Sequence, residues 1–164
     1  MRNLILVAFT EPVAPGLVFP RDDWPLHITL LRFDVEPPAS TDVVPHLIQR
    51  AAAPVAGALG AVLRIGDDAG FGVQGSIPVS LVDHHPLLQG LHEELLDAVE
   101  ELGGKVAIPR YVLEGYRPHI SHHNSKRPKP GDVVVLDHIA LVDMAPGGNH
   151  TIRKILELWR VPTA

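Results

Sequence analysis

The chain has 164 residues, of which 46% are hydrophobic, so it contains enough apolar material for one packed core and is not a disordered segment. Its formal net charge of −5 excludes a global basic surface of the kind that holds long nucleic acids. The sequence has no cysteine, which excludes disulfides and thiolate sites and fits a reducing compartment such as the cytoplasm. No apolar run approaches the length of a membrane span.

Apolar runs in the first half of the chain are short and are separated by prolines and glycines. Residues 4–9 are predicted to form a buried strand, and a second strand is predicted at residues 25–33, after a proline-rich loop. A helix is predicted to begin at Ser40 or Thr41, because either hydroxyl can cap free amide groups. Pro54 is expected to kink or end this helix, since proline removes a backbone donor.

The middle of the chain predicts a pair of strands and the most regular helix. Residues 61–65 and 73–82 are predicted to form two strands around a glycine-rich turn at residues 66–72. Asp83 is expected to cap the helix that follows, and the Gly103-Gly104 pair is expected to end it. One face of this helix carries apolar residues at helical spacing: Leu88, Leu91, Leu95, Val99 and Leu102.

The last third of the chain favours strands. Short strands are expected at residues 111–113 and 118–122, and longer strands at residues 133–142 and 152–161. Strands therefore outnumber helices, and the two helices fall one in each half. This order predicts a single α+β domain over residues 1–164, with mainly antiparallel sheets and two sub-lobes.

One tripeptide pattern occurs twice, as His27-Ile28-Thr29 and as His119-Ile120-Ser121. Each copy lies in a predicted strand, where side chains alternate between two faces. The histidine and the hydroxyl residue of each copy therefore share a face, while the central isoleucine points into the protein. Histidine titrates near neutral pH, so one imidazole is suited to act as a base and the other as an acid.

This pair of His-x-Thr/Ser tripeptides resembles the motifs of the two-histidine (2H) phosphoesterase superfamily, which includes 2′-5′ RNA ligase-like proteins and cyclic phosphodiesterases. The resemblance rests on Pro25-Leu26-His27-Ile28-Thr29-Leu30 and Arg117-Pro118-His119-Ile120-Ser121. It implies a bilobal α+β fold with two mainly antiparallel sheets, pseudo-twofold symmetry, a central cleft and helices on the outside. It also implies metal-independent cleavage, without a cofactor, of a cyclic phosphate, a small nucleotide, or a short oligonucleotide that is cyclic or 2′-5′ linked.

In-line cleavage of a phosphodiester needs a base for the attacking oxygen and an acid for the leaving oxygen on the far side of phosphorus. His27 and His119 are the expected pair, in either order. Thr29 and Ser121 are expected to donate hydrogen bonds to the non-bridging oxygens, where charge grows in the transition state.

Two arginines lie close to the motifs in the sequence. Arg117 shares the parity of His119, so we expect it either to clamp a phosphate in the cleft or to form a surface ion pair. Arg32 has the opposite parity to His27, so we expect a structural role for it unless the strand bulges.

The segment after the second motif is polar, where the family pattern continues with apolar residues. His123 shares the parity of Ser121 and is a candidate for substrate binding, whereas His122 is expected to point away. The basic run at residues 126–129 begins with Lys126, which is expected to attract substrate phosphates unless the run is a solvated loop. Clustered histidines also leave a zinc site open as an alternative, although no ligand set with known spacing is present.

Aromatic residues make up only 5% of the chain, so platforms for base stacking are scarce. The candidates are Trp24, Tyr116 and Phe71, each of which is equally suited to the core. Four other histidines are expected to be solvated: His46, His84, His85 and His92.

The leading hypothesis is a cytoplasmic, monomeric phosphoesterase that acts on a small nucleotide or short oligonucleotide, without duplex or membrane partners. One alternative is a nucleotide-binding module that sequesters a signalling nucleotide without hydrolysing it. Another is a metal-dependent hydrolase that uses the extra histidines. The natural substrate, the product regiochemistry, the role of each histidine and a cellular or viral origin stay open at this point.

Overall fold

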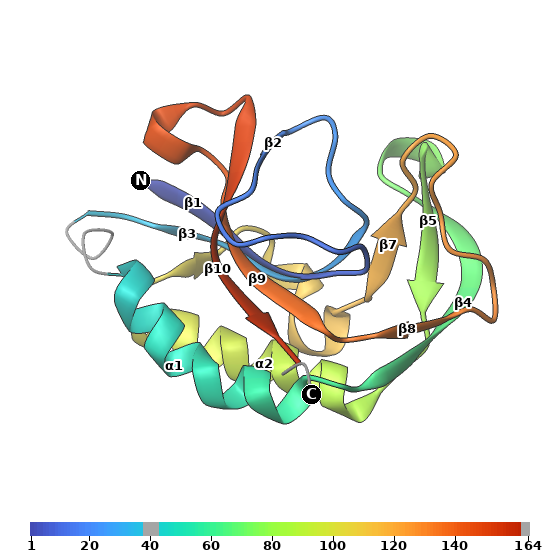
Figure 1. Cartoon of the computed structure of the whole chain (residues 1–164), viewed down its shortest axis with the longest axis horizontal. Helices are drawn as coiled ribbons and strands as arrows, with labels where there is room; N and C mark the ends of the chain where they lie inside the picture. The colour runs from blue at the N-terminus through green and yellow to red at the C-terminus, as the bar shows by residue number, and fades with distance from the viewer. Residues whose placement is uncertain (38–42, 162–164) are drawn as a thin grey trace.

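The computed structural model describes residues 1–37 and 43–161 and shows an α+β fold (Figure 1). Within these residues, all strands of the sheet pair in antiparallel fashion. The sheet has ten strands in the order β2-β10-β9-β1-β3-β7-β5-β4-β8, with β6 attached to β3. The strands are β1 (Arg2–Phe9), β2 (Val18–Pro20), β3 (His27–Val35), β4 (Val62–Phe71), β5 (Ile77–Val82), β6 (Lys105–Val106), β7 (His119–Ser121), β8 (Val133–Val135), β9 (His138–Asp143) and β10 (Ile152–Arg160).

The sheet consists of two lobes that meet where β3 pairs with β7. The larger lobe, β2-β10-β9-β1-β3, carries the first motif on β3, and the smaller lobe, β7-β5-β4-β8, carries the second motif on β7. The expected bilobal antiparallel arrangement is therefore confirmed, although the two sheets are continuous with each other. The chain returns to the larger lobe through β9 and β10, so the lobes do not divide the sequence into its two halves.

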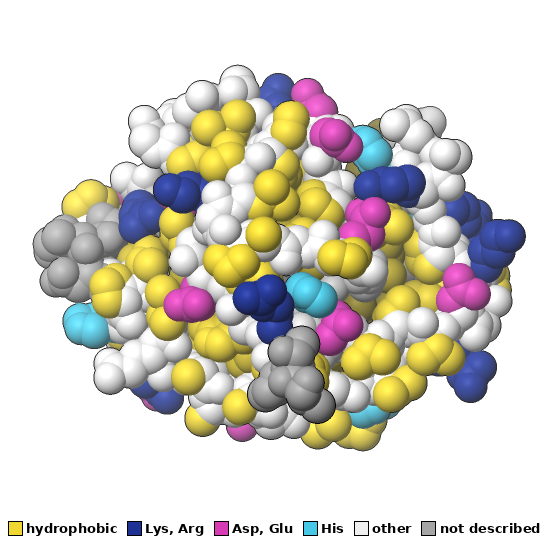
Figure 2. Space-filling view, viewed as in Figure 1, with side chains coloured by type: hydrophobic (Ala, Val, Ile, Leu, Met, Phe, Trp, Pro, Cys, Tyr) yellow, Lys and Arg dark blue, Asp and Glu magenta, His cyan; other side chains and the backbone are white. Residues whose placement is uncertain are grey.

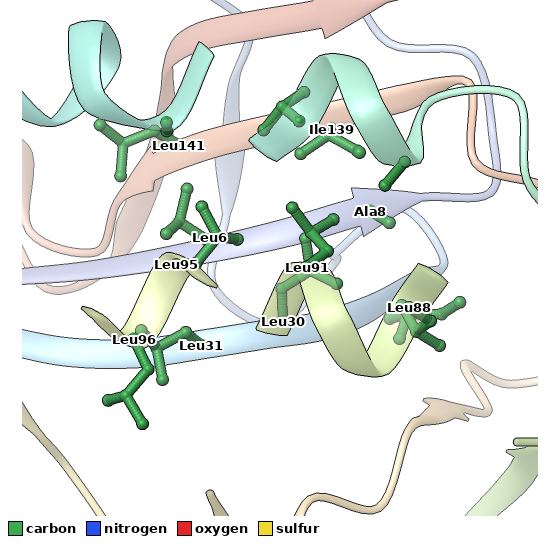
Figure 3. Close-up of a cluster of buried hydrophobic side chains, with 14 of the residues drawn as sticks. Leu6, Ala8, Leu30, Leu31, Leu88, Leu91, Leu95, Leu96, Ile139 and Leu141 are labelled. Carbon is green, nitrogen blue, oxygen red and sulfur yellow. The ribbon is translucent and has the colours of Figure 1, made fainter. Parts of the chain in front are cut away.

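Two helices, α1 (Val43–Ala58) and α2 (Pro86–Glu101), pack against each other on one side of the sheet (Figure 1). The apolar stripe of α2 is buried as expected, and Leu88, Leu91 and Leu95 lie against side chains of β1, β3 and β9 (Figure 3). Neither helix among the described residues is long and apolar enough to cross a membrane. The helices leave the opposite side of the sheet available for a site.

Strand β1 is buried on both faces. Leu6 and Ala8 lie in the core under the helices, whereas Val7 and Phe9 lie in a second cluster with Phe19 from the segment that precedes β3. A strand covered on both faces has no polar side, which explains the uninterrupted apolar run at residues 4–9. The covering segment also brings Trp24 next to the first motif.

A β-bulge interrupts β3 after the first motif. The pairing of β3 with β1 shifts register once, which leaves Leu30 as an extra residue. Beyond the bulge, Leu31 and Phe33 join the core under the helices, and Arg32 is exposed on the other face. Arg32 therefore shares the face of His27. The strand therefore has the bulge that the sequence left open for Arg32, and the opposite parity expected from strict alternation does not hold, because the bulge reverses the alternation of side chains.

The two helices differ from the expectation at specific positions. Helix α1 continues through Pro54 to Ala58, because Ala51 and Val55 are fully buried and their packing offsets the hydrogen bond that proline removes. The expected cap of this helix, at residues 40–41, lies outside the described residues. His85, not Asp83, caps α2.

Strand boundaries in the smaller lobe also differ. β4 continues through residues 66–71, which were expected to form a turn, because a bulge absorbs the irregularity and the turn comes later, at residues 72–76. Gly70 and Gly75 approach so closely that a Cβ on Gly70 would lie 2.5 Å from the Gly75 carbonyl oxygen, which explains why this turn is glycine-rich. Residues 111–113 lie in 3₁₀ turns and not in a strand. The expected strand at residues 133–142 is divided into β8 and β9, which belong to different lobes.

Candidate active site

The two motif tripeptides lie on adjacent antiparallel strands. Ile28 of β3 pairs directly with Ile120 of β7, which places the histidine of each motif opposite the hydroxyl residue of the other. Both isoleucines are fully buried in the core under the helices. The two histidines and the two hydroxyls therefore share the opposite face of the sheet. The register relates the two tripeptides by a local twofold axis.

Each histidine ring is held in the same way. His27 Nδ1 lies 2.9 Å from the carbonyl oxygen of Pro25, and His119 Nδ1 lies 2.8 Å from that of Arg117. A carbonyl oxygen only accepts hydrogen bonds, so each Nδ1 carries a hydrogen. Each Nε2 is thereby the nitrogen that can take up or release a proton during a reaction.

An aromatic side chain packs against each histidine. The Trp24 ring lies 4.5 Å from His27 between centroids, and the Phe71 ring at the end of β4 lies 4.4 Å from His119. Phe9 also meets His27 edge-on, at 6.1 Å. These apolar contacts keep water away from one side of each imidazole and restrict its rotation.

The environment favours the neutral form of both histidines. Burial lowers the pKa of His27 to about 4, the charge of His119 adds to the lowering, and the hydrogen bond to Pro25 opposes it. Burial also lowers the pKa of His119, as does the charge of Arg117. The two rings lie on adjacent paired strands, so each senses the charge of the other. In the ligand-free protein at neutral pH, His27 therefore presents an unprotonated Nε2, as a general base requires.

Two pockets lie beside the motif strands. The first has a volume of about 240 Å³ and is bounded by the segment before β3 and the segment after β7. The second has a volume of about 210 Å³ and lies between α2 and the residues before β7, Arg117 and Tyr116 among them. The first pocket is lined by Arg21, Asp22, Trp24, Pro25, Leu26, His27, Ser121, His122 and His123.

Two contacts between polar side chains connect the walls of the first pocket. Asp23 Oδ1 lies 3.1 Å from His123 Nε2, and Glu11 Oε2 lies 2.9 Å from Lys126 Nζ. The same Glu11 oxygen accepts a hydrogen bond from the Leu26 backbone N–H at 2.6 Å, immediately before the first motif. The segment before β3 is thus attached to the segment after β7, and the attachment holds the pocket in shape.

No protein-family model matches the chain, and no curated protein matches it. Solved structures do match it. A phosphoesterase shares 14% identity with a TM-score of 0.59 and covers 99% of this chain and 100% of its own. E. coli LigT in complex with NADP+ shares 14% identity with a TM-score of 0.60, over 99% of this chain and 98% of its own. TT0787 of Thermus thermophilus shares 20% identity with a TM-score of 0.57, over 98% of this chain and 97% of its own.

The chain has the fold of LigT. The fold shared with LigT and with the matching phosphoesterase is the fold that the two tripeptides led us to expect, so this expectation is confirmed at the level of the fold. The match extends from one end of the chain to the other. The LigT fold also agrees with the arrangement found here, an antiparallel curved sheet with two helices.

Within the LigT fold, Arg117 lies at the second motif. Its guanidinium carbon is 4.8 Å from the centroid of the Phe71 ring, which in turn packs on His119. The side chain is exposed, and the ion pairs found among the described residues do not include it. Arg117 is therefore free to pair with an anionic ligand.

Tyr116 is tied to the protein itself. Its hydroxyl donates a hydrogen bond of 2.8 Å to the Thr29 carbonyl oxygen, its ring stacks on His92 at 4.0 Å, and burial raises its pKa. The expectation that His92 is solvated was wrong, because it is 1% exposed. His92 Nδ1 donates to the Leu30 carbonyl oxygen at 2.7 Å, and Nε2 accepts from the Leu113 N–H at 2.9 Å. Tyr116 and His92 thus support the motif strand from the side of α2.

Much of the polar segment after β7 is paired with other residues. His122 Nε2 lies 2.7 Å from Ser80 Oγ on β5, so its ring is held by β5 at the edge of the first pocket. Lys126 is bound to Glu11, and Arg127 is bound to Asp68. The basic run is therefore largely neutralised in the ligand-free protein. Charges of both signs are also interspersed over the face drawn in Figure 2.

No group of three or more His, Cys, Asp or Glu side chains within residues 1–37 and 43–161 is arranged to hold a metal ion.

Two residues of the site, Glu11 and Asp23, were not identified from the sequence. Both lie in the segment between β1 and β3, which is rich in proline and has no periodic pattern. Their partners lie about a hundred positions away in the chain, at His123 and Lys126. No local signal in the sequence connects such residues.

Proposed function

We propose that this chain is a phosphodiesterase of the 2H type that needs no metal ion and cleaves a phosphodiester in a small nucleotide or short oligonucleotide. The observation that carries the proposal is the twofold arrangement about the Ile28–Ile120 pair, which presents two anchored histidines and two hydroxyls on one face. The LigT fold supports it, since LigT was solved with NADP+, with 3′-AMP and with ATP.

The two histidines take opposite roles. His27 is the base, because its lowered pKa keeps Nε2 free to accept a proton from the attacking water or hydroxyl. His119 is the acid and gives its Nε2 proton to the leaving oxygen. A phosphodiester anion bound between the rings raises the pKa of both, so that His119 holds its proton in the complex. The roles exchange when the reaction runs in the opposite direction.

The remaining groups bind and position the substrate. Thr29 and Ser121 donate hydrogen bonds to the non-bridging oxygens, and Arg117 pairs with the phosphate from the side of His119. Trp24 and His123 line the first pocket, where a sugar or base can lie. Tyr116 acts on the strand backbone and Lys126 acts through Glu11, so both are positioning residues. All these groups come from one chain, and we expect the protein to act as a monomer.

A substrate screen tests this proposal. Purified protein is incubated with 2′,3′-cyclic mononucleotides, 2′-5′ oligoadenylate and cyclic di- and trinucleotides, with and without a chelator, and products are identified by mass. We expect cleavage that survives the chelator. The substitutions His27→Ala and His119→Ala each lower kcat/KM by about 10²-fold or more. The control His46→Ala, an exposed histidine on α1, leaves kcat/KM unchanged.

Other outcomes reject the proposal in different ways. Full activity in the His27→Ala variant rejects the assignment of His27 as the general base. Tight binding of a nucleotide that is recovered unchanged favours a module that sequesters nucleotides. Loss of activity with the chelator favours a metal-dependent hydrolase.

A further inference from the structure

Three arginines from separate parts of the chain converge on the face that carries the first motif. Arg21 lines the first pocket, and its backbone N–H donates to the Thr151 carbonyl oxygen at the start of β10. Arg153 lies on β10, and Arg32 reaches the same face because of the bulge in β3. Burial lowers the pKa of Arg153, and the nearby charges of Arg21 and Arg32 lower it further. Arg32 and Arg153 lie on the face of the sheet opposite the helices, and Arg21 is hydrogen-bonded to the residue that precedes β10.

The position of Arg153 is well defined. Its Nη1 donates to the carbonyl oxygens of Met144 at 2.5 Å, His150 at 3.0 Å and Ile152 at 3.2 Å. Its Nε is buried and has no hydrogen-bond partner. The guanidinium is thus held by neutral carbonyl groups, and none of its hydrogen-bond partners carries a charge that balances its own.

The negative charge near this cluster is small. Asp22 is the carboxylate whose charge raises the pKa of Arg153, and it also lies 3.6 Å from Arg21 Nε. The Asp22 side chain is 89% exposed, so water screens its effect. The ion pairs among the described residues include neither Arg32 nor Arg153. Asp34, two residues beyond Arg32 on the same face of β3, is a second nearby carboxylate, and its Oδ1 accepts a hydrogen bond from Asn3 Nδ2. Three arginines beside these two carboxylates leave a local excess of positive charge in a chain whose net charge is −5.

Trp24 connects this cluster to the reacting centre. Its ring lies 4.5 Å from the His27 ring, and the Arg153 guanidinium carbon lies 5.9 Å from the Trp24 centroid. A nucleoside placed along Trp24, with its reacting phosphate at His27, has its other end directed toward the arginines. Arginine is well suited to a phosphate there, because its planar fork of donors matches phosphate oxygens.

We propose that Arg21, Arg32 and Arg153 form a second anion subsite, which binds a phosphate group of the nucleotide substrate that is separate from the phosphodiester being cleaved. This inference rests on the proposed function and narrows it to nucleotides that carry an additional phosphate, such as a 5′-phosphate. The subsite contributes to affinity and substrate choice and takes no part in proton transfer.

The test compares adenosine 2′,3′-cyclic phosphate with the same nucleotide carrying a 5′-phosphate. We expect the wild-type protein to prefer the 5′-phosphorylated substrate by about tenfold or more in kcat/KM. Arg21→Ala and Arg32→Ala each reduce this preference severalfold, and the double variant brings the ratio of the two kcat/KM values close to one. Arg160→Ala, an exposed arginine at the far end of β10, leaves the ratio unchanged.

A wild-type ratio near one, or a preference that survives in the double variant, overturns the subsite while leaving the phosphodiesterase proposal intact. If neither nucleotide is cleaved, that substrate class is rejected for the enzyme, and calorimetric binding of the same two nucleotides to the same variants decides on the subsite. Equal affinities for the two nucleotides then overturn it. Tighter binding of the 5′-phosphorylated nucleotide that depends on Arg21 and Arg32 supports it.

Discussion

Ile28 of β3 and Ile120 of β7 lie directly opposite each other at the paired position that joins the two lobes, and both are fully buried. Their side chains belong to the core, while the polar residues on either side of them belong to the site. The packing of this pair therefore fixes how the two histidines face each other.

Truncation of one member of this pair is expected to weaken both the fold and the site. Ile120→Ala lowers the free energy of unfolding by about 2–5 kcal/mol, because it leaves a cavity where the lobes meet. Urea denaturation measures the change. The control Ile77→Ala, at a 47% exposed position on β5, changes stability by less than about 0.5 kcal/mol. Equal effects of the two substitutions are incompatible with a packed junction.

The pH dependence of kcat/KM is expected to be bell-shaped with an optimum on the acidic side. The rate rises as His27 loses its proton above its pKa of about 4. It falls as His119 loses its proton, and the pKa of His119 lies below its ordinary value of 6.5. Initial rates at low substrate concentration from pH 3.5 to 8.5 give the profile. An optimum of kcat/KM above pH 7 contradicts these assignments, whereas a higher optimum for kcat alone agrees with them, because bound phosphate raises both pKa values.

The free energy of unfolding is expected to fall as the pH is lowered, because His27 has a lower pKa in the folded protein than in the unfolded chain. Between its folded pKa of about 4 and its ordinary pKa of 6.5, the unfolded chain binds a proton that the folded protein does not. The contribution of His27 to the free energy of unfolding is therefore fully present above pH 6.5. It decreases by about 3 kcal/mol as the pH falls to 4. Urea denaturation across this range compares the wild type with His27→Gln, whose stability changes less with pH. His46→Gln, on an exposed face of α1, keeps the wild-type dependence.

Tyr116→Phe tests whether this residue positions the motif strand or contacts the substrate. The substitution removes the hydrogen bond to the Thr29 carbonyl oxygen and is expected to cost about 1 kcal/mol of stability. We expect kcat to fall severalfold with little change in KM. Tyr111→Phe, at a 52% exposed tyrosine, changes neither constant. A rise in KM without loss of kcat assigns Tyr116 to substrate binding instead.

Several features of this fold could be predicted because their signal is local. The helical spacing of Leu88, Leu91 and Leu95 predicted the buried face of α2, and the two tripeptides predicted which side chains share a face of a strand. Burial and strand alternation act over a few residues, so a short stretch of sequence records them. The face of Arg32 could not be fixed from the sequence, because one extra residue in β3 reverses that alternation and nothing at residues 25–33 shows whether the strand bulges.

The sequence by itself determined the class of the fold, the two histidines with their neighbouring hydroxyls, and the isoleucines that anchor them. Only the tertiary structure decided which carbonyl holds each Nδ1, which aromatic ring packs on each imidazole, and which acidic residue pairs with Lys126. The physical reason is that periodicity and parity are set by neighbours along the chain. Ion pairs, burial and pKa values are set by groups that meet in space, and these come from segments whose separation in the sequence carries no information about their contact.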